Sequence, residues 1–421
     1  MKSRLLVAAA LVIAALAFSA APATADPYDA QLQGRQFDAQ FLLTSLFLPG
    51  DDLSTIGVSQ AELATAGPQS SAAGAGPHTY IVDNDHLQCP NAAFTTIQSA
   101  VFASGPGDLI RVCPGTYQEQ VDIGPGHDGL TVFSQQPRQA IIKAPQPAMT
   151  EPGDIVRIHN VQNVSLKQFV ISGPLPDMLF CSPQSRTGVR IDQGASALLR
   201  DNQITQIRST SPALRGCQNG VAVLVGRMFD PAGPTTGTAW ITHNAIDRYQ
   251  KGGIVVDNAG SSATIDHNVV AHGAEDVIPI APNGIQVSRG AAGQVDHNVV
   301  TENNGAASGT GLLLYQAGAG LVQVDHNDVY RNDDGISLYE SNDETVAHNN
   351  SHEQLFYDGL FMDSLSTGNT IAENDAYLNA EHDCHDDSVG TATAGTANFW
   401  IKDKGETQNK LGLCKKATVT P

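Results

Sequence analysis

A short pattern recurs along the chain at nearly regular intervals, and it restricts the fold more than any other feature. Histidine followed by asparagine occurs at positions 243/244, 267/268, 297/298, 326/327 and 348/349. A glycine that opens a short apolar strand, such as GIVVD or GLLLY, keeps step with this pair. These glycines are Gly188, Gly220, Gly253, Gly284, Gly311, Gly335 and Gly359. Two markers in step predict one repeating unit of about 24 residues, lengthened by loops in the earlier units.

Each unit is expected to contain three short strands, the first beginning at the glycine and the second ending at the asparagine. Alternate residues of a strand face the same side, so Ile254 and Val256 should stack inside with their counterparts in other units. Strands this short find their partners one unit further along, which gives parallel sheets and a rise of about 4.8 Å per turn. The repeat therefore predicts an all-β, single-stranded parallel solenoid of roughly ten coils.

The asparagines are expected to form a ladder at the turn between the second and third strands. Asparagine tolerates left-handed backbone, and its amide both donates and accepts hydrogen bonds. The expected members are Asn202, Asn244, Asn268, Asn298, Asn327, Asn349 and Asn374. The neighbouring histidines would then stack one coil apart. We interpret this column as packing, with metal binding as the alternative, because a linear stack converges poorly on one ion.

The two ends of the chain carry different signals. Residues 1–25 have the features of a secretory signal peptide, and the protein is therefore expected to be secreted and extracellular. Residues 26–77 are interpreted as an N-terminal extension and linker, and residues 78–421 as the repeat domain with its caps. After residue 25, no apolar run approaches the roughly 18 residues of a membrane span, so no membrane insertion is expected.

Both ends of a solenoid need covers, because an open sheet edge invites pairing with another chain. The segment TTIQSAVFA has helical spacing at Ile97, Val101 and Phe102 and is expected to cover the first coil. The segment after Cys384, tied back by Cys414, is expected to cover the last.

Six cysteines in an exported chain are expected to be bridged. Neighbour pairing is preferred among the fifteen possibilities: Cys89 with Cys113, Cys181 with Cys217 and Cys384 with Cys414.

The net charge of −20 disfavours binding to nucleic acid or anionic membranes. An anionic substrate would therefore need a local basic patch or a bridging cation.

The segment FTTIQSAVFASGPGDLIRVCPGTYQEQVDI (94–123) resembles the opening of the right-handed parallel β-helix superfamily, which includes pectate lyases, polygalacturonases and pectin methylesterases. The segment beginning DCHDDSVG resembles the closing segment of a secreted bacterial subgroup of unknown activity. The resemblance covers about residues 78–414. It implies a right-handed parallel β-helix with an N-terminal helical cap, a disulfide-tied C-terminal cap and a substrate cleft along the glycine strands. The Gly-His-Gly and Arg-x-Lys motifs of polygalacturonases are absent, so the resemblance implies a fold and not a reaction.

Carboxylates beside the glycine strands are the candidate catalytic residues. Asp334 and Asp358 precede two neighbouring glycines and should lie roughly 5 Å apart, with Asp333 beside them. Because stacked carboxylates must share a proton or bind a cation, Asp334 and Asp358 are candidates for acid/base cleavage of a glycoside or for binding Ca²⁺. Arg289 is the candidate that stabilises charge during the reaction.

Further outward residues of the same strands are candidates for binding substrate. Tyr315 and Tyr339 on adjacent coils would offer a surface for stacking a sugar, and Asp257 and Asp363 lie in the same column. Separately, EHDCHDDS (381–388) is interpreted as a disulfide-fixed acidic turn, with cation binding as the alternative.

Two functional hypotheses remain open at this point. In the first, the protein is a polysaccharide lyase or glycoside hydrolase that acts on a chain laid along the glycine strands. In the second, it is a non-catalytic solenoid that binds an extracellular glycan or another surface. Metal binding along the histidines is a third and weaker possibility. Neither the oligomeric state nor the substrate follows from the sequence.

Overall fold

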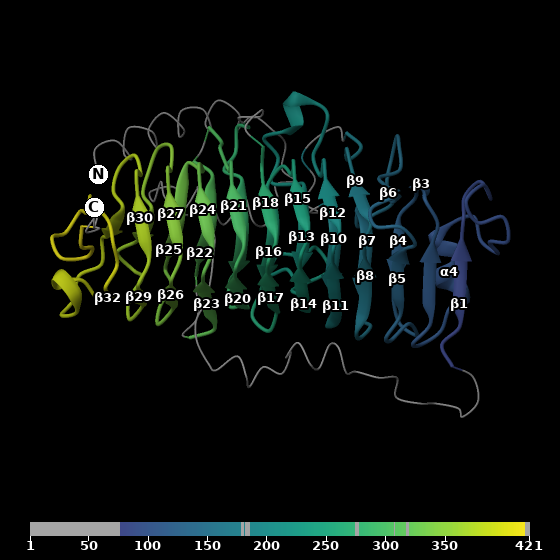
Figure 1. Ribbon diagram of the computed structural model, residues 1–421, viewed down its shortest axis with the longest axis horizontal. Coiled ribbons are helices and arrows are strands. Elements are labelled where there is room, and N and C mark those ends of the chain that lie inside the picture. Colours follow the sequence, from purple (N-terminus) through teal and green to yellow (C-terminus); the bar gives the residue numbers. More distant parts are fainter. Residues whose placement is uncertain are drawn as a thin grey trace, which may run out of the picture.

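The chain winds into a coil whose three faces are parallel sheets of 12, 10 and 10 strands. The computed structural model describes residues 76–416, except 178–180, 182–185, 274–277, 307 and 317–319. Successive coils follow one another along the long axis, from β1 and α4 at one end to β32 at the other (Figure 1). The predicted parallel β solenoid is confirmed. The expected signal peptide and nearly all of the N-terminal extension lie outside the described residues.

Each full coil contributes one strand to each sheet. The twelve-stranded sheet contains β1 (Thr79–Val82), β2 (Leu109–Val112), β5 (Thr131–Ser134), β8 (Val164–Lys167), β11 (Ala195–Arg200), β14 (Gly237–Thr242), β17 (Ser262–Asp266), β20 (Ala292–Asp296), β23 (Val322–Asp325), β26 (Thr345–Ala347), β29 (Thr370–Ala372) and β32 (Phe399–Ile401). The glycine-strand sheet contains β4 (Val121–Ile123), β7 (Asp154–His159), β10 (Thr187–Asp192), β13 (Val221–Val225), β16 (Gly252–Asp257), β19 (Asn283–Ser288), β22 (Thr310–Tyr315), β25 (Asp334–Tyr339), β28 (Leu360–Met362) and β31 (Cys384–Asp386). The short-strand sheet contains β3 (Gly115–Gln118), β6 (Ala140–Lys143), β9 (Val170–Ser172), β12 (Gln203–Thr205), β15 (Ala245–Asp247), β18 (Val269–Ala271), β21 (Val299–Thr301), β24 (Asp328–Tyr330), β27 (Asn350–His352) and β30 (Asp375–Tyr377).

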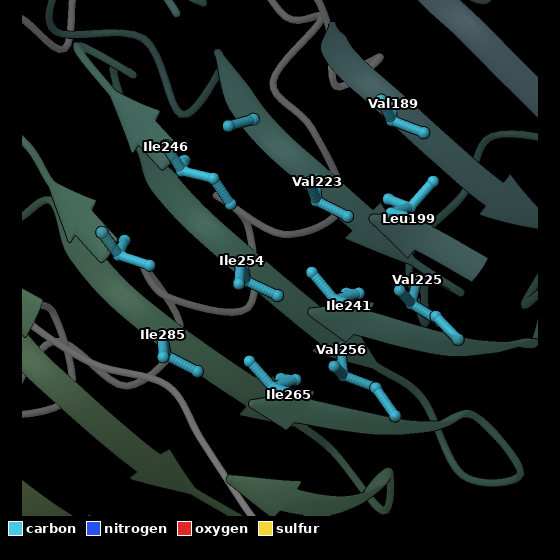
Figure 2. Packing of buried hydrophobic residues seen from close by; sticks show 14 of the residues in the cluster. Val189, Leu199, Val223, Val225, Ile241, Ile246, Ile254, Val256, Ile265 and Ile285 are labelled. Atoms are coloured by element: carbon cyan, nitrogen blue, oxygen red, sulfur yellow. The ribbon is translucent and has the colours of Figure 1, made fainter. Parts of the chain in front are cut away.

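The core is a set of aliphatic columns that run through the centre of the coil. In the glycine-strand sheet, the register aligns Val189, Val223, Ile254 and Ile285, all fully buried. Figure 2 shows these side chains pointing into the space between the sheets, where they meet residues such as Ile241 of the twelve-stranded sheet. The predicted interior columns are confirmed. Each coil buries its apolar face only when its neighbours are present, so the stack is stabilised as a whole.

One glycine breaks the expected register. Gly220 was expected to occupy the same strand position as Gly188 and Gly253, but the residue paired in register with them is Ala222. Gly220 lies before β13 with a φ of +77°, so it forms the turn into the strand. The outward residues of β13 therefore fall two positions later than the glycine spacing indicated.

The asparagine ladder is present as predicted and continues beyond it. Each asparagine from Asn202 to Asn374 donates both its backbone N–H and its side-chain Nδ2 to the Oδ1 of the next, and the last donates to Asp403, at 2.8–3.0 Å. The left-handed residue at this turn, however, is the histidine and not the asparagine. His267, for example, has a φ of 54°. The asparagine is therefore selected for its amide hydrogen bonds and the turn is made one residue earlier.

Both expected caps are present. Helix α4 (Ile97–Ala103) buries Ile97 and Val101 at the first coil, but Phe102 is 78% exposed and Ala100 takes its place in the core. At the other end, the segment around β31, the short helix η4 (Thr393–Gly395) and β32 closes the coil. A second short helix, η3 (Pro212–Leu214), lies in a loop.

The three disulfides follow the predicted neighbour pairing, Cys89 with Cys113, Cys181 with Cys217 and Cys384 with Cys414. Among the described residues, no helix is both long and apolar enough to cross a membrane.

Candidate functional site

A pocket lies on the glycine-strand sheet over β13, β16 and β19. Strands β13 and β16 lie near the middle of the solenoid (Figure 1). Its floor is a small apolar cluster of Val221, Leu224 and Val255, separate from the main core. Its remaining lining is polar or aromatic: Gln218, Arg227, Phe229, Lys251, Asp257, Gln286 and Arg289. An apolar floor with a few polar groups at the rim is the usual composition of a small-molecule site.

Three cationic side chains reach this pocket from different connections of the coil. Arg227 and Arg289 follow the ends of β13 and β19, and Lys251 immediately precedes β16. The guanidinium of Arg289 lies 4.9 Å from the ring centre of Phe229, within cation–π range. Arg227, Lys251 and Arg289 share the lining of the pocket with one carboxylate, Asp257, so basic side chains predominate there in an otherwise acidic chain.

Lys251 is the most perturbed of the three cations. Burial, together with the smaller effect of the nearby charge of Arg289, lowers the pKa of Lys251 to about 7. Its Nζ donates a 2.7 Å hydrogen bond to the carbonyl oxygen of Ala281. A lysine with a pKa near neutrality exists partly as the free amine at neutral pH, and in that form it can accept a proton.

Asp257 and Arg289, both predicted as site residues, contact each other. Arg289 Nη1 donates to Asp257 Oδ1 at 2.9 Å, and the backbone N–H of Met228 donates to Asp257 Oδ2 at 2.8 Å. Asp257 is only 3% exposed. The carboxylate therefore fixes both the guanidinium and the loop after β13, and it acts on the pocket by positioning Arg289.

The predicted tyrosine pair is adjacent but buried. Tyr315 and Tyr339 are partners in register between β22 and β25, as expected. Tyr315 is 2% exposed and Tyr339 is 6% exposed, and Tyr339 packs beside Phe361 with ring centres 5.2 Å apart. In this structure their rings are part of a packed aromatic row and do not present an open surface to a sugar.

Asp333 and Asp363, also predicted as site residues, accept hydrogen bonds from backbone N–H groups. Asp333 Oδ2 accepts 2.7 Å hydrogen bonds from the N–H groups of Gly305 and Gly309. Asp363 Oδ1 accepts from Ser366 Oγ and from the N–H groups of Glu340 and Leu365. Burial raises the pKa of both carboxyls to about 6, although these hydrogen bonds oppose the shift.

Asp334 and Asp358 lie on adjacent coils, as the spacing predicted, and form the second candidate site. Asp334 Oδ2 accepts from Ser337 Oγ at 2.9 Å, and Asp334 Oδ1 accepts from the backbone N–H of Asp358 at 3.2 Å. Asp358 is fully buried and contacts two imidazoles, Nδ1 of His382 at 3.1 Å and Nδ1 of His385 at 3.0 Å. Asp358 and these two histidines bring their ligand atoms within 4.8 Å of one another.

The structure does not bring the acidic pair and Arg289 into one site. Asp334 is aligned through Thr310 with Asn283, the first residue of β19, whereas Arg289 follows the last residue of that strand. Six residues at about 3.3 Å each separate them by roughly 20 Å along the strand direction. Neither Asp334 nor Asp358 lines the pocket that contains Arg289. The basic pocket and the acidic pair are therefore distinct sites on one sheet.

The histidine column is a regular stack on the surface. Ring centres from His243 through His267, His297, His326 to His348 are 5.0, 5.1, 5.0 and 4.8 Å apart, and the first three ring pairs are nearly parallel. The predicted packing role is therefore supported. Asp325 contacts Nδ1 of both His326 and His348 at 2.8 Å, and these three residues form an exposed group that meets the spacing of a metal site.

Two sets of residues were not anticipated. Arg227 and Lys251 lie in connections, where the sequence showed no repeat. The second set is a further row of amides, buried except for the half-buried Asn379, in which Asn303, Asn332, Gln354 and Asn379 each donate to the next residue and the last to Asp383. Each of the four follows a ladder asparagine by five residues, and this constant offset is a signal that could have revealed the row.

Comparison with known proteins supports the fold. Residues 233–402, from before β14 to the end of β32, match the family model described as right handed beta helix region. The protein folds as a right-handed parallel β-helix. This finding agrees with the three parallel sheets and confirms the resemblance at the level of the fold. A search of curated proteins found no match to this β-helix sequence.

Solved structures with a similar course include a lacto-N-biosidase from Eubacterium ramulus, with 11% identity, 80% of this chain and 66% of that chain covered, and a TM-score of 0.48. XylC in complex with xylose has 13% identity, coverage of 71% and 69%, and a TM-score of 0.45. An alginate lyase from Paenibacillus sp. str. FPU-7 has 12% identity, coverage of 81% and 98%, and a TM-score of 0.43. Identities of 11–13% and TM-scores below 0.5 assign neither a substrate nor residue roles to this chain.

Proposed function

We propose that this β-helix protein is exported and binds an acidic polysaccharide along its glycine-strand sheet, with the central pocket as the subsite for one charged sugar. The observation that carries the proposal is the gathering of Arg227, Lys251 and Arg289 around an apolar floor in a chain of net charge −20. A uronate or sulfate group would pair with the guanidinium groups, and the ring of Phe229 offers an aromatic wall for a sugar.

The remaining surface charge supports a local rather than a general mode of binding. A nucleic acid contacts protein along many phosphates, and the acidic surface would repel it beyond the pocket. An acidic polysaccharide would meet the same repulsion along the sheet, so its electrostatic attraction is confined to the one charged sugar in the pocket. The three disulfides are stable in the oxidising environment of an exported protein.

Direct binding measurements test the proposal. The full mature chain is titrated with polygalacturonate, alginate and a neutral glucan, and affinity is measured at two salt concentrations. The acidic polymers should bind, and their affinity should fall as salt increases, while the neutral polymer should bind weakly or not at all. Equal affinity for the neutral polymer would count against the proposal.

Two matched arginine variants locate the subsite. Arg289→Ala should weaken binding about 10- to 100-fold, since a hydrogen bond to a charged group contributes roughly 1.5–3 kcal/mol. Arg331→Ala is the control, because Arg331 forms an exposed pair with Glu353 on another sheet and should leave the affinity unchanged. Equal effects of the two substitutions would exclude the pocket as the subsite.

A second candidate function, lyase-type cleavage, is favoured by one observation, the pKa of about 7 for Lys251 inside the pocket. In β-elimination the free amine would take the proton from C5 of a uronate, the C4–O bond would break with a double bond forming between C4 and C5, and the departing oxygen would take up a proton. An arginine paired with the uronate would stabilise the developing charge. Release of an unsaturated product, measured by ultraviolet absorbance, would appear in wild type and disappear in Lys251→Met, while Arg227 and Arg289 keep the binding measurable. Binding without product by wild type would leave a non-catalytic glycan-binding protein.

A further inference from the structure

We propose that Asp358, His382 and His385 form a binding site for one divalent transition-metal ion of the zinc class. The site lies at the C-terminal end of the glycine-strand sheet, where Asp358 precedes β28 and the two histidines come from the residues around the start of β31. It is independent of polysaccharide binding in the central pocket. One carboxylate oxygen and two imidazole nitrogens lie within 4.8 Å of one another.

The positions of the ring nitrogens and carboxylate oxygens in this cluster suit a cation. Both ring nitrogens of His385 face carboxylate oxygens, Nδ1 at 3.0 Å from Asp358 Oδ2 and Nε2 at 3.1 Å from Asp387 Oδ1. A neutral imidazole carries one N–H, so it can donate to only one of these oxygens. An imidazolium would donate to both oxygens, whereas a neutral ring that donates from Nε2 to Asp387 directs the lone pair of Nδ1 toward Asp358 and is free to coordinate a cation there. A metal ion between Nδ1 of His385 and the carboxylate of Asp358 would form a coordinate bond with each of them.

The surroundings match those of metal-binding histidines. Such histidines commonly donate their second N–H to a carboxylate, which fixes the ring and its tautomer, and Asp387 occupies that place beside His385. The rings of His382 and His385 meet at 81° with centres 4.9 Å apart, so their nitrogens converge on Asp358 instead of lying in a stack. This geometry distinguishes the cluster from the parallel histidines of the column on the surface.

The ligand types select the metal. Two imidazoles and one carboxylate suit zinc and its neighbours, whereas calcium prefers a cluster made of oxygen ligands. Calcium at Asp334 and Asp358 was predicted from the carboxylates alone, and the two histidines favour a softer ion. An ion at Asp358 would connect neighbouring coils next to the Cys384–Cys414 disulfide and so stabilise the C-terminal cap.

Metal titration of the full mature chain tests the proposal. Protein freed of metal by a chelator is titrated with Zn²⁺ against a fluorescent competitor, and its melting temperature is measured with Zn²⁺ or Ca²⁺. Wild type should bind one buried-site ion and melt at a higher temperature with Zn²⁺ than with Ca²⁺. Absence of Zn²⁺ binding, or an effect of Ca²⁺ alone, overturns the proposal.

Paired variants assign the ion to this cluster. The double variant His382→Gln/His385→Gln should lose the thermal shift and weaken binding at least about 10-fold. The control His326→Gln/His348→Gln removes the exposed candidate group at Asp325 and should keep both properties. The opposite pattern refutes the assignment. If the first double variant does not fold, Asp387→Asn keeps all three ligands and should still weaken binding about 10- to 100-fold. An unchanged affinity in Asp387→Asn would then overturn the proposal.

Discussion

The asparagine of each coil satisfies backbone groups that the turn would leave without partners. Asn298 illustrates this: its Oδ1 accepts from the backbone and side chain of Asn268, while its Nδ2 donates to the carbonyls of Ile265 and Asp296 and to Asn327 Oδ1. The N–H and amide of Asn268 and the carbonyls of Ile265 and Asp296 thereby gain partners, as buried polar groups in proteins generally require. The preceding residue, His297, adopts the left-handed backbone conformation, and its ring stacks at the surface.

Removing one amide from the ladder should be costly. Asn298→Ala leaves the N–H and amide of Asn268 and two carbonyls without their side-chain partner, and each buried group left unpaired costs roughly 1–3 kcal/mol. We expect the free energy of unfolding to fall by about 3 kcal/mol or more in guanidinium denaturation. Asn91→Ala, an exposed asparagine, should change it by less than about 0.5 kcal/mol. Similar small decreases in the free energy of unfolding for both variants would mean that the asparagine ladder does not stabilise the fold.

A single histidine–carboxylate pair should give a measurable pH effect. The hydrogen bond with Asp122 raises the pKa of His159 above its ordinary 6.5, although burial opposes the shift. A raised histidine pKa stabilises the fold fully below the unfolded pKa, and the stabilisation is lost as pH rises through the folded pKa. His159→Gln should therefore lower the melting temperature more at pH 6 than at pH 9. An equal decrease in melting temperature at pH 6 and at pH 9 would contradict this account.

At the scale of elements, the N-terminal helix shows how the first coil is closed. Thr96 caps α4 by accepting from the N–H of Ser99, and the carboxylate of Glu119, which follows β3, accepts from the N–H groups of Ile97 and Gln98 at 2.9 Å. A carboxylate at a helix N-terminus satisfies free N–H groups and interacts favourably with the helix dipole. The cap is thus bound to the coil by charge-assisted hydrogen bonds as well as by its apolar face.

Loss of this carboxylate should loosen the cap. Glu119→Ala is expected to destabilise the protein by roughly 1–3 kcal/mol and to increase amide exchange within α4 more than in the central strands. Gln118→Ala, at an exposed neighbouring position, is the control and should alter neither quantity. Equal exchange in the helix of the variant and of wild type would show that Glu119 does not hold the cap.

The elements also show where prediction from the sequence succeeds. The repeat in Gly253, Ile254 and Asn268 has a short period, and every coil repeats it, so strand order, interior columns and ladder could all be predicted. Phe102 was misplaced because helical spacing does not say how wide the covered face is. Gly220 was misaligned because a glycine at a turn and a glycine in a strand look the same in sequence. Lys251 and the pocket were missed because they depend on how connections of unequal length fold back over the sheet.

At the scale of the whole molecule, buried carboxylates make stability depend on pH. Burial raises the pKa of Asp154, Asp333, Asp363 and Asp403 to about 6 each. The folded state therefore binds more protons than the unfolded state between the ordinary carboxyl pKa and about 6. Stability from these groups is greatest at low pH and is lost as pH rises through 6. The net charge of −20 acts in the same direction, because acidification reduces self-repulsion.

The melting temperature should accordingly be higher near pH 5 than near pH 7.5. Asp363→Asn keeps an oxygen to accept from Ser366, Glu340 and Leu365 and removes one of the titrating groups, so its melting temperature should vary less over this range. Asp85→Asn, at an exposed position, should follow wild type. A melting temperature that falls from pH 7.5 to pH 5 would contradict the assignment of raised pKa values.

The central claim is that a solenoid with an acidic surface binds a charged glycan at one basic pocket. The most direct measurement is a crystal structure of the protein with an acidic oligosaccharide such as a short uronate oligomer. We predict one carboxylate of the sugar within hydrogen-bond distance of Arg289 or Arg227, with the sugar ring over Val221, Leu224 and Val255. An oligosaccharide bound on another sheet, with the pocket filled only by water, would contradict the account.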